Sequence, residues 1–267
     1  MPTVNDVNKY IFSIAPLEMK ADFDNVGFLV GRGDSDASRI LVSLDITDDV
    51  ISEAIETGAG LVVSHHPMFF SLKSVTDMDT TGKHIVRMLS GGISAICMHT
   101  NLDAAHGGIN DVLAAVVGIA EDGESTELLS GDGRLASGDA FSYGRVGFLK
   151  KPCSLPEYLE RLKKALKTNG LRYYDAGRKV HKVAIASGSG ADMLENAVGH
   201  GCDTFVTADI KYHVFLQAKE QGINLVDGDH FCTENVVTGV LADKLRAAFP
   251  DAKVTVSEAH RQVAEFY

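Results

Sequence analysis

The sequence contains no tryptophan, and aromatic residues of all kinds make up only 7% of its 267 positions. Apolar residues still account for 45% of the chain, so its core must be built mainly from Val, Ile, Leu and Ala. Short runs of such residues are typical of buried parallel strands. The composition therefore favours a layered α/β structure over an aromatic-rich β-sandwich, and the length allows one large or two moderate domains.

Basic residues are also few, because 25 Lys and Arg stand against 36 Asp and Glu, for a formal net charge of -11. No run of four or more basic residues occurs. Binding to nucleic acids or to anionic membranes needs basic patches, so we expect neither as a direct partner. No segment has the apolar length needed to span a bilayer.

Cysteines are scarce and scattered, at positions 97, 153, 202 and 232, with no CxxC pair. A disulfide framework is therefore not expected, and a reducing compartment fits better. The first residues lack the basic leader and long apolar run of a signal peptide. We predict a cytoplasmic protein.

Short apolar runs alternate with amphipathic segments through most of the chain. The first part predicts strands over 39–44, 61–64 and 93–98, and helices over 48–57, 81–89 and 108–117. The later part predicts strands over 141–149, 182–187, 204–207, 224–226 and 253–256, and helices over 155–168, 192–198, 214–221 and 234–249. This rhythm implies an α/β (α+β) fold with mainly parallel or mixed sheets flanked by helices.

A stretch rich in Gly, Ser, Asp and Glu, residues 121–138, interrupts the pattern and marks either a domain boundary or a loop. We predict two intertwined lobes. The first comprises residues 1–124 with 233–267, and the second comprises residues 125–232.

Potential metal ligands follow directly after three of the predicted strands. The second strand runs into a tandem His pair, the third into a His and an Asp, and the strand over 224–226 into two Asp, a His and a Glu: His65, His66; His99, Asp103; Asp227, Asp229, His230, Glu234. Sites in parallel α/β sheets lie beyond the carboxyl ends of the strands. We therefore expect these side chains to converge.

The spacing of the ligands favours two metal ions over one. His230 and Glu234 are four residues apart, which places both on one face of a helix that starts near His230. Pro67 favours an extended conformation for His66, so the side chains of His65 and His66 should diverge. Three imidazoles and two carboxylates suffice for two ions: His65, His66, Asp103, His230 and Glu234. For any single histidine, a satisfied or surface side chain is the alternative interpretation.

Several motifs resemble those of the NIF-three-like family, whose members are also called type 2 GTP cyclohydrolase I. They extend nearly from end to end of the chain: DNVGFLVG (24–31), SHHPMFF (64–70), HTNLDAAHGGIND (99–111), ASGSG (186–190), TADIKYH (207–213) and DGDHFCTE (227–234). The match is weakest over 121–179. Longer relatives carry an inserted middle domain, and this chain resembles the short form without it.

The resemblance implies a two-lobed fold with a dinuclear metal site between the lobes, and a toroidal homohexamer whose sites face an internal cavity. The family's ligands match the five residues identified above, with Glu234 as the bridging carboxylate. His99 matches a histidine close to the metals that more often faces substrate than ligates. Two residues depart from the family pattern, since Asp229 replaces a usual Gly and His106 a common Pro.

Other residues are candidates for binding substrate or moving protons. Ser187, Gly188 and Ser189 lie between a strand and a helix, where backbone N–H groups can cradle a phosphate, although a plain tight turn explains them as well. Lys211 is a candidate for binding a substrate phosphate, with a solvated lysine as the alternative. His99 and His213 are the candidate catalytic residues that carry a proton.

We therefore expect a dinuclear metal-dependent hydrolase. By resemblance the candidate reaction is GTP cyclohydrolysis, which opens the imidazole ring of GTP and releases formate, and a related nucleotide or phosphoester hydrolysis is chemically compatible. The cofactors would be two divalent ions, with Zn, Fe, Mn, Co and Ni all open. The alternative function is a non-enzymatic metal-handling or regulatory adapter protein.

Overall fold

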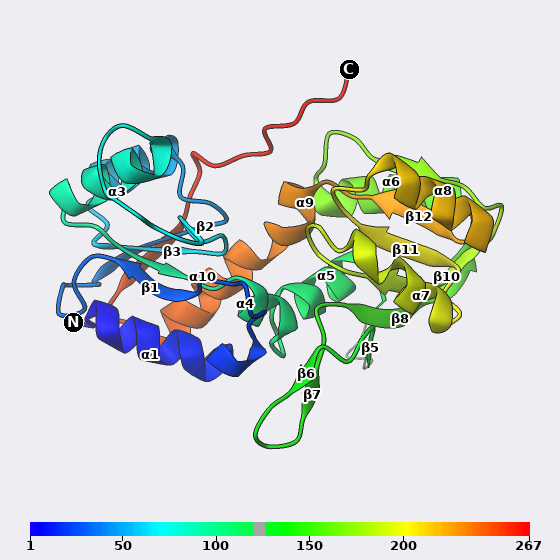
Figure 1. Ribbon diagram of the computed structural model, residues 1–267, viewed down its shortest axis with the longest axis horizontal. Coiled ribbons are helices and arrows are strands. Elements are labelled where there is room, and N and C mark those ends of the chain that lie inside the picture. Colours follow the sequence, from blue (N-terminus) through cyan, green and yellow to red (C-terminus); the bar gives the residue numbers. More distant parts are fainter. Residues whose placement is uncertain (120–125) are drawn as a thin grey trace. The chain divides into compact units, whose positions relative to one another are not determined.

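A computed structural model describes residues 1–119 and 126–267, and these residues form two compact units. Unit 1 comprises residues 1–105 and 238–261, and unit 2 comprises residues 106–237 and 262–267. Each unit has its own sheet and helices (Figure 1). The α/β class with mixed sheets expected from the sequence is confirmed, and each unit is described below by itself.

The sheet of unit 1 has five strands in the order β1-β4-β3-β2-β13. Their bounds are β1 (Gly27–Val30), β2 (Arg39–Ser43), β3 (Leu61–Ser64), β4 (Ser94–Cys97) and β13 (Lys253–Val256). The last four strands of this order run parallel, and β1 joins the edge antiparallel to β4. Strands β2, β3 and β4 are almost entirely buried, and their carboxyl ends lie along one edge of the sheet. Whatever follows β2, β3 and β4 therefore meets at that edge.

Helices lie on both sides of this sheet, with α1 and α3 on opposite sides (Figure 1). The helices of unit 1 are α1 (Val4–Ile14), α2 (Asp48–Thr57), α3 (Thr80–Ser90), α4 (Thr100–Ala104), the short turn η1 (Leu17–Met19) and most of α10 (Val236–Ala248). Their starts follow local chemistry, since Thr3 and Asp6 form a capping box at α1 and Thr47 caps α2. Val50, Ile51 and Ala54 of α2 then pack with Met88 of α3 against the sheet.

The sheet of unit 2 has six strands in the order β5-β8-β10-β11-β12-β9. Only the central strands β10, β11 and β12 are parallel, and β8 and β9 flank them antiparallel. The strands are β5 (Glu127–Leu128), β8 (Arg145–Cys153), β9 (Arg172–Tyr174), β10 (Val180–Ile185), β11 (Thr204–Thr207) and β12 (Asn224–Asp227), and a separate hairpin joins β6 (Gly133–Arg134) to β7 (Ala140–Phe141).

Alternate residues of these strands face two different cores, as the period of a β-strand requires. Val183 packs with α5 and α6, whereas the next residue, Ala184, packs with α7 and α8. The helices of unit 2 are α5 (Ile109–Val117), α6 (Leu155–Leu166), the short turn η3 (Ala191–Met193), α7 (Leu194–Gly199), α8 (Tyr212–Gln221) and α9 (His230–Glu234). Gly222 ends α8 in the left-handed conformation that glycine favours.

The chain passes from unit 1 to unit 2 between residues 105 and 106, returns to unit 1 between 237 and 238, and passes to unit 2 again between 261 and 262. The predicted boundary between residues 124 and 125 lies outside the described residues. Helix α5 belongs with unit 2 because Leu113 and Val117 share a core with Tyr158. Residues 262–267 also belong with unit 2, where Asn169 binds the backbone of Ala264.

One predicted strand is displaced. The sequence predicted a strand over 141–149, but residues 142–144 form a bend and β8 runs from Arg145 to Cys153. The side chain of Ser142 accepts hydrogen bonds from the backbone of Ser130 and Gly144, which turns the chain before β8 begins. Within the described residues, none of the helices combines the length and the apolar character that crossing a membrane would require.

Candidate metal centre

The candidate ligands of unit 1 follow β3 and β4 at the carboxyl edge of the sheet. His65 and His66 come directly after β3, and their backbone N–H groups both donate to the carbonyl of Leu44. His99 follows β4 and precedes α4, which carries Asp103. His65 is buried, with 1% of its surface exposed. The parallel register that pairs Ser64 with Cys97 thus brings the two strand ends together.

Each histidine of this group is held through its Nδ1 atom. The Nδ1 of His65 donates to the carbonyl oxygen of Met98 at 2.8 Å, that of His66 to Asp45 at 2.7 Å, and that of His99 to Asp24 at 2.8 Å. A carbonyl or a carboxylate can only accept, so Nδ1 carries the hydrogen. Nε2 is then the nitrogen that can ligate a metal ion, as is usual for metal-binding histidines.

The three rings form a compact group that could hold a metal ion. One ring nitrogen from each of His65, His66 and His99 lies within 4.8 Å of the others. Two imidazoles on one ion lie at most about 4.2 Å apart, given metal–nitrogen distances of about 2.1 Å. Asp103 adds a carboxylate oxygen 3.9 Å from His65 Nε2. The donor set of imidazoles and a carboxylate fits a divalent transition metal.

Two aspartates that orient these rings were not among the predicted site residues. Asp45 accepts from His66 and also from His260 Nε2, at 2.7 Å in both cases. Burial raises the pKa of Asp45, but these two hydrogen bonds outweigh it and hold the pKa well below its usual range. Asp45 follows β2 as His65 follows β3, so the same strand-end rule could have found it. Nothing in the sequence pattern points to His260.

Asp24 is the second orienting aspartate, and its side chain is buried. It accepts from His99 Nδ1, from the backbone N–H of Asn25 and from both the backbone and the hydroxyl of Thr100. Burial raises its pKa, but the hydrogen bonds from His99 and Thr100 outweigh burial and lower it from 3.8 to about 2. Asp24, the first residue of the DNVGFLVG motif, thus fixes the orientation of His99.

Lowering the pH should destabilise the fold because Asp24 becomes protonated. Because its pKa is lowered in the folded state, its stabilising contribution is complete above about pH 4 and is lost as the pH falls towards 2. We expect the free energy of unfolding of metal-free protein to lose about 2 kcal/mol more over this interval in wild type than in Asp24→Asn. Denaturant unfolding followed by circular dichroism at several pH values measures this, and parallel declines in both proteins would contradict it.

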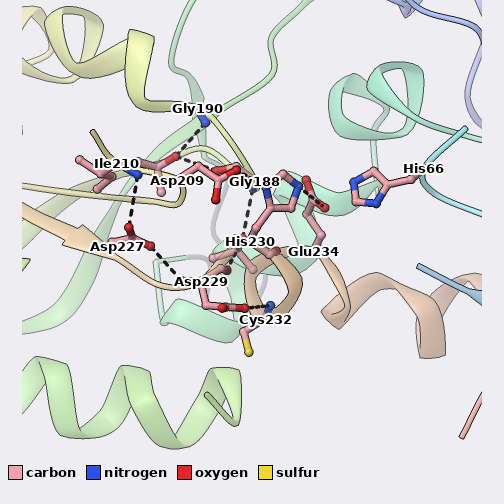
Figure 2. A network of polar contacts seen from close by, with 12 residues as sticks. His66, Gly188, Gly190, Asp209, Ile210, Asp227, Asp229, His230, Cys232 and Glu234 are labelled. Carbon is pink, nitrogen blue, oxygen red and sulfur yellow. Dashed lines mark hydrogen bonds and ion pairs between the residues drawn. The ribbon is translucent and has the colours of Figure 1, made fainter. Parts of the chain in front are cut away.

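The candidate ligands of unit 2 lie on the short helix α9, which starts at His230 as the spacing required. His230 lies between two carboxylates (Figure 2): its Nδ1 is 2.7 Å from Asp209 and its Nε2 is 3.1 Å from buried Glu234. Burial lowers the pKa of His230, but the hydrogen bonds and charges of Glu234 and Asp209 together raise it to about 9. A metal ion that binds Nε2 must therefore displace a proton at neutral pH.

Gly188 packs directly on the candidate ligands His230 and Glu234 (Figure 2). Its φ of 56° lies in the left-handed region, and a Cβ at this position would overlap a carboxylate oxygen of Glu234 and lie 3.2 Å from His230 Nε2. The backbone N–H of Gly188 donates to Thr233 Oγ1, one residue before Glu234. Glycine at position 188 thus allows the backbone to approach Glu234 and His230 closely, which is a role that the sequence alone did not assign.

The backbone around Gly188 is engaged within the protein. The N–H groups of Ser187, Gly188 and Gly190 donate to Asn110, Thr233 and Thr207 respectively. Of the three residues expected to cradle a phosphate, Ser187 and Gly188 therefore donate their backbone N–H groups to protein oxygens. The geometry favours the tight-turn interpretation of this segment over the phosphate cradle.

Three other predicted residues share one pocket of unit 2. Ser189, Lys211 and His213 line a pocket of about 360 Å³, and Asp209 contributes to the same wall. Lys211 and His213 are exposed side chains at the start of α8. Asp192 and Glu195 line the pocket as well, so its charge is mixed rather than uniformly basic. The pocket can offer hydroxyl, ammonium, imidazole and carboxylate groups to one polar ligand.

Asp229, directly before His230, has a strained backbone conformation. Its φ is 72° and its ψ is 135°, a conformation that side-chain-bearing residues rarely adopt. Its side chain offsets part of the strain by accepting from the N–H of Cys232 at 3.0 Å (Figure 2). Asp209, which holds His230, also has a positive φ, of 51°. Two of the three such non-glycine residues among the described residues therefore adjoin His230.

Replacing Asp229 with glycine should stabilise the protein. The substitution removes about 1–3 kcal/mol of backbone strain, whereas glycine costs only a few tenths of a kcal/mol as a helix cap. We expect a gain of about 1 kcal/mol in the free energy of unfolding, measured by denaturant titration. Asp229→Ala is the matched control, because it loses the cap without relieving the strain and should lower stability. Equal effects of the two substitutions on the free energy of unfolding would show that the backbone of Asp229 is not strained.

Cys232 and His106 belong to neither group of candidate ligands. Cys232 is buried in the core beside α5 and α6, and burial raises its pKa to about 12, so it is a packed thiol. His106 is fully exposed, and its Nδ1 lies 3.2 Å from Asp111.

Comparison with known proteins identifies the family of this chain. The model of the Duf34/NIF3 family (NGG1p interacting factor 3) matches residues 2–262. A Clostridium acetobutylicum protein named GTP cyclohydrolase 1 type 2 homolog is 36% identical over 247 residues, covering 92% of this chain and 90% of that protein. A Clostridium perfringens protein of the same name is 34% identical over 270 residues, covering 98% and 99%.

A solved structure shows the same fold. The structure of a Bacillus cereus protein related to NIF3 superimposes with a TM-score of 0.91 at 22% identity, covering 100% of this chain and 99% of that one. At this identity the likeness concerns the fold. With the family match over nearly the whole sequence, the resemblance carried by the motifs is confirmed: the chain belongs to the DUF34/NIF3 family.

Proposed function

We propose that this chain is a hydrolase that holds two divalent metal ions through His65, His66, Asp103, His230 and Glu234. The observation that carries this proposal is the orientation of the histidines. Each of His65, His66 and His230 has its Nδ1 against an oxygen acceptor, as does His99. Side chains held in this way are typical of metal ligands, because the second hydrogen bond fixes the tautomer and the ring orientation.

The metal ions, when bound, would supply Lewis acidity and a water activated near neutral pH. The side chains of the protein would supply proton transfer. His99 is held by Asp24 and so has one defined orientation from which to carry a proton. His213 is exposed in the pocket beside Lys211 and is the second candidate.

For the substrate we propose a nucleotide, with GTP as the first candidate. This rests on the relatives, which carry the name GTP cyclohydrolase 1 type 2 homolog. The candidate reaction consumes water, opens the imidazole ring of the base and releases formate. Lys211 and Ser189 would bind the phosphates in their shared pocket.

A homohexamer is likewise proposed on the family alone. Light scattering on a sizing column should return a mass of six chains, and a monomer would contradict it.

The proposed hydrolase activity is tested with protein whose metal content has been measured. The protein is assayed with GTP and a panel of other nucleotides, and the release of formate and phosphate is measured. We expect turnover by wild type and by His200→Ala, whose histidine follows the end of α7 and lies beside Glu127. Turnover by His66→Ala should fall to background. No turnover by protein that exchanges its metal freely would overturn the proposal and favour a metal-handling protein. Activity that survives His66→Ala would show that the site is wrong.

A further inference from the structure

Two large aromatic side chains of unit 1 lie exposed beside each other. Phe23 has 69% of its surface exposed and Phe70 has 56%. Their ring centroids are 6.2 Å apart and the ring planes are tilted by 50°. At this distance and tilt neither ring covers the face of the other, so both keep apolar surface open to solvent. Burying a phenylalanine side chain usually stabilises a fold. Phe23 and Phe70 do not contribute this stabilisation, because both rings are exposed.

The backbone that carries these rings is fixed. Asp24, next to Phe23, accepts hydrogen bonds from His99 and Thr100. Asn25 donates through its side chain to the backbone carbonyl of Phe69, next to Phe70, at 2.8 Å. The loop that carries Phe23 is therefore hydrogen-bonded to the loop that carries Phe70 and to the residues that follow β4. The rings occupy defined positions rather than the ends of loose loops.

The pair adjoins the candidate metal centre. The ring of Phe70 packs edge to face on His99, with centroids 6.0 Å apart and planes at 60°. His99 in turn contacts His65 and His66, with ring centroids 5.1 and 5.6 Å away. An uninterrupted row of rings thus leads from the exposed phenylalanines to the ligand histidines. A molecule that lay on the phenylalanines would have its neighbouring atoms close to those histidines.

We propose that Phe23 and Phe70 form a stacking platform for the flat heteroaromatic ring of the substrate, a purine base or a ring of similar size. Aromatic side chains bind bases through their faces without hydrogen bonds, which suits two rings that carry no polar group. The platform deepens the proposed function, since it assumes a nucleotide substrate, and it assigns recognition of the base to unit 1.

The absence of tryptophan from the chain allows a direct test. Phe70→Trp places a single fluorophore on the platform at an exposed position, where the larger ring has room. In the full-length protein, guanosine 5′-monophosphate should quench this fluorescence saturably. Ribose 5-phosphate, which lacks the base, should not. Adding Phe23→Ala should weaken binding of guanosine 5′-monophosphate about tenfold, whereas Leu89→Ala, which removes another exposed apolar side chain of unit 1, should leave it unchanged.

Several results would overturn the platform. These are no quenching by guanosine 5′-monophosphate, equal quenching by ribose 5-phosphate, or no effect of Phe23→Ala. A blue shift of the Phe70→Trp fluorescence as the protein concentration rises, without nucleotide, would also overturn it. This shift would show that the rings are buried against a second copy of the chain instead of binding a base. Binding of the nucleotide without turnover would support the platform and contradict the hydrolase function. Turnover of GTP with the same KM in Phe23→Ala as in wild type would support the hydrolase function and contradict the platform.

Discussion

Replacing Glu234 with alanine should abolish the retention of metal. Glu234 is buried, and its carboxylate lies 3.1 Å from His230 Nε2. Loss of a residue that merely orients a ligand costs about 10–100-fold in metal affinity, so loss of Glu234 as the proposed bridging ligand should cost on the order of 100-fold or more. Hydrolytic activity should disappear with the metal. Alanine suits a helix, so α9 and the fold should persist.

Metal affinity is measured by competition with a chromophoric chelator, beside circular dichroism to establish folding. Glu220→Ala is the matched control, because Glu220 is an exposed glutamate on α8 of the same unit. It should bind metal like wild type. If Glu234→Ala binds metal as tightly as the control, Glu234 is not a ligand.

Gly188→Ala should damage both stability and metal binding. The new Cβ would overlap Glu234, and the left-handed φ of 56° adds strain for any residue with a side chain. Together these should lower the free energy of unfolding by about 3 kcal/mol. Because relief of the clash must move Glu234 or the loop that carries residue 188, metal affinity should fall at least about tenfold.

Gly201→Ala separates the two causes. Gly201 lies in the same unit with a φ of 71°, but a Cβ there would meet no heavy atom within 4 Å. It should therefore show only the backbone cost, about 1 kcal/mol, with unchanged metal affinity. Chemical denaturation and the chelator assay give both quantities for each variant. Equal losses in the two variants would show that the close approach to Glu234 has no consequence.

Much of the fold could be predicted because its signals are local. The strands over 61–64 and 204–207 and the helix over 48–57 have the predicted bounds. Each strand is a short run that is buried at every position. The helix combines an apolar period with a cap at Thr47 and a glycine at position 58. The strand predicted over 141–149 was misplaced because the bend at 142–144 depends on hydrogen bonds from Ser130. That partner is invisible to a periodicity argument.

The histidines of the candidate site could be predicted for a similar reason. A parallel sheet brings its carboxyl strand ends together, so residues that follow β3 and β4 must meet. Asp24 and His260 could not be predicted. Asp24 binds a histidine 75 positions away in the chain, and His260 follows the last strand in a segment without periodicity. Only the folded chain shows that they orient His99 and bind Asp45.

The metal content of the purified protein tests the two-metal centre most directly. Metal-free protein would be incubated with excess Zn²⁺ or Mn²⁺, separated from unbound ion, and analysed by mass spectrometry of the metal. We predict two ions retained per chain in wild type, and none in a variant in which His65, His66 and Glu234 are all replaced by alanine. No retained metal in wild type, or the same content in both proteins, would contradict a metal centre built from these residues.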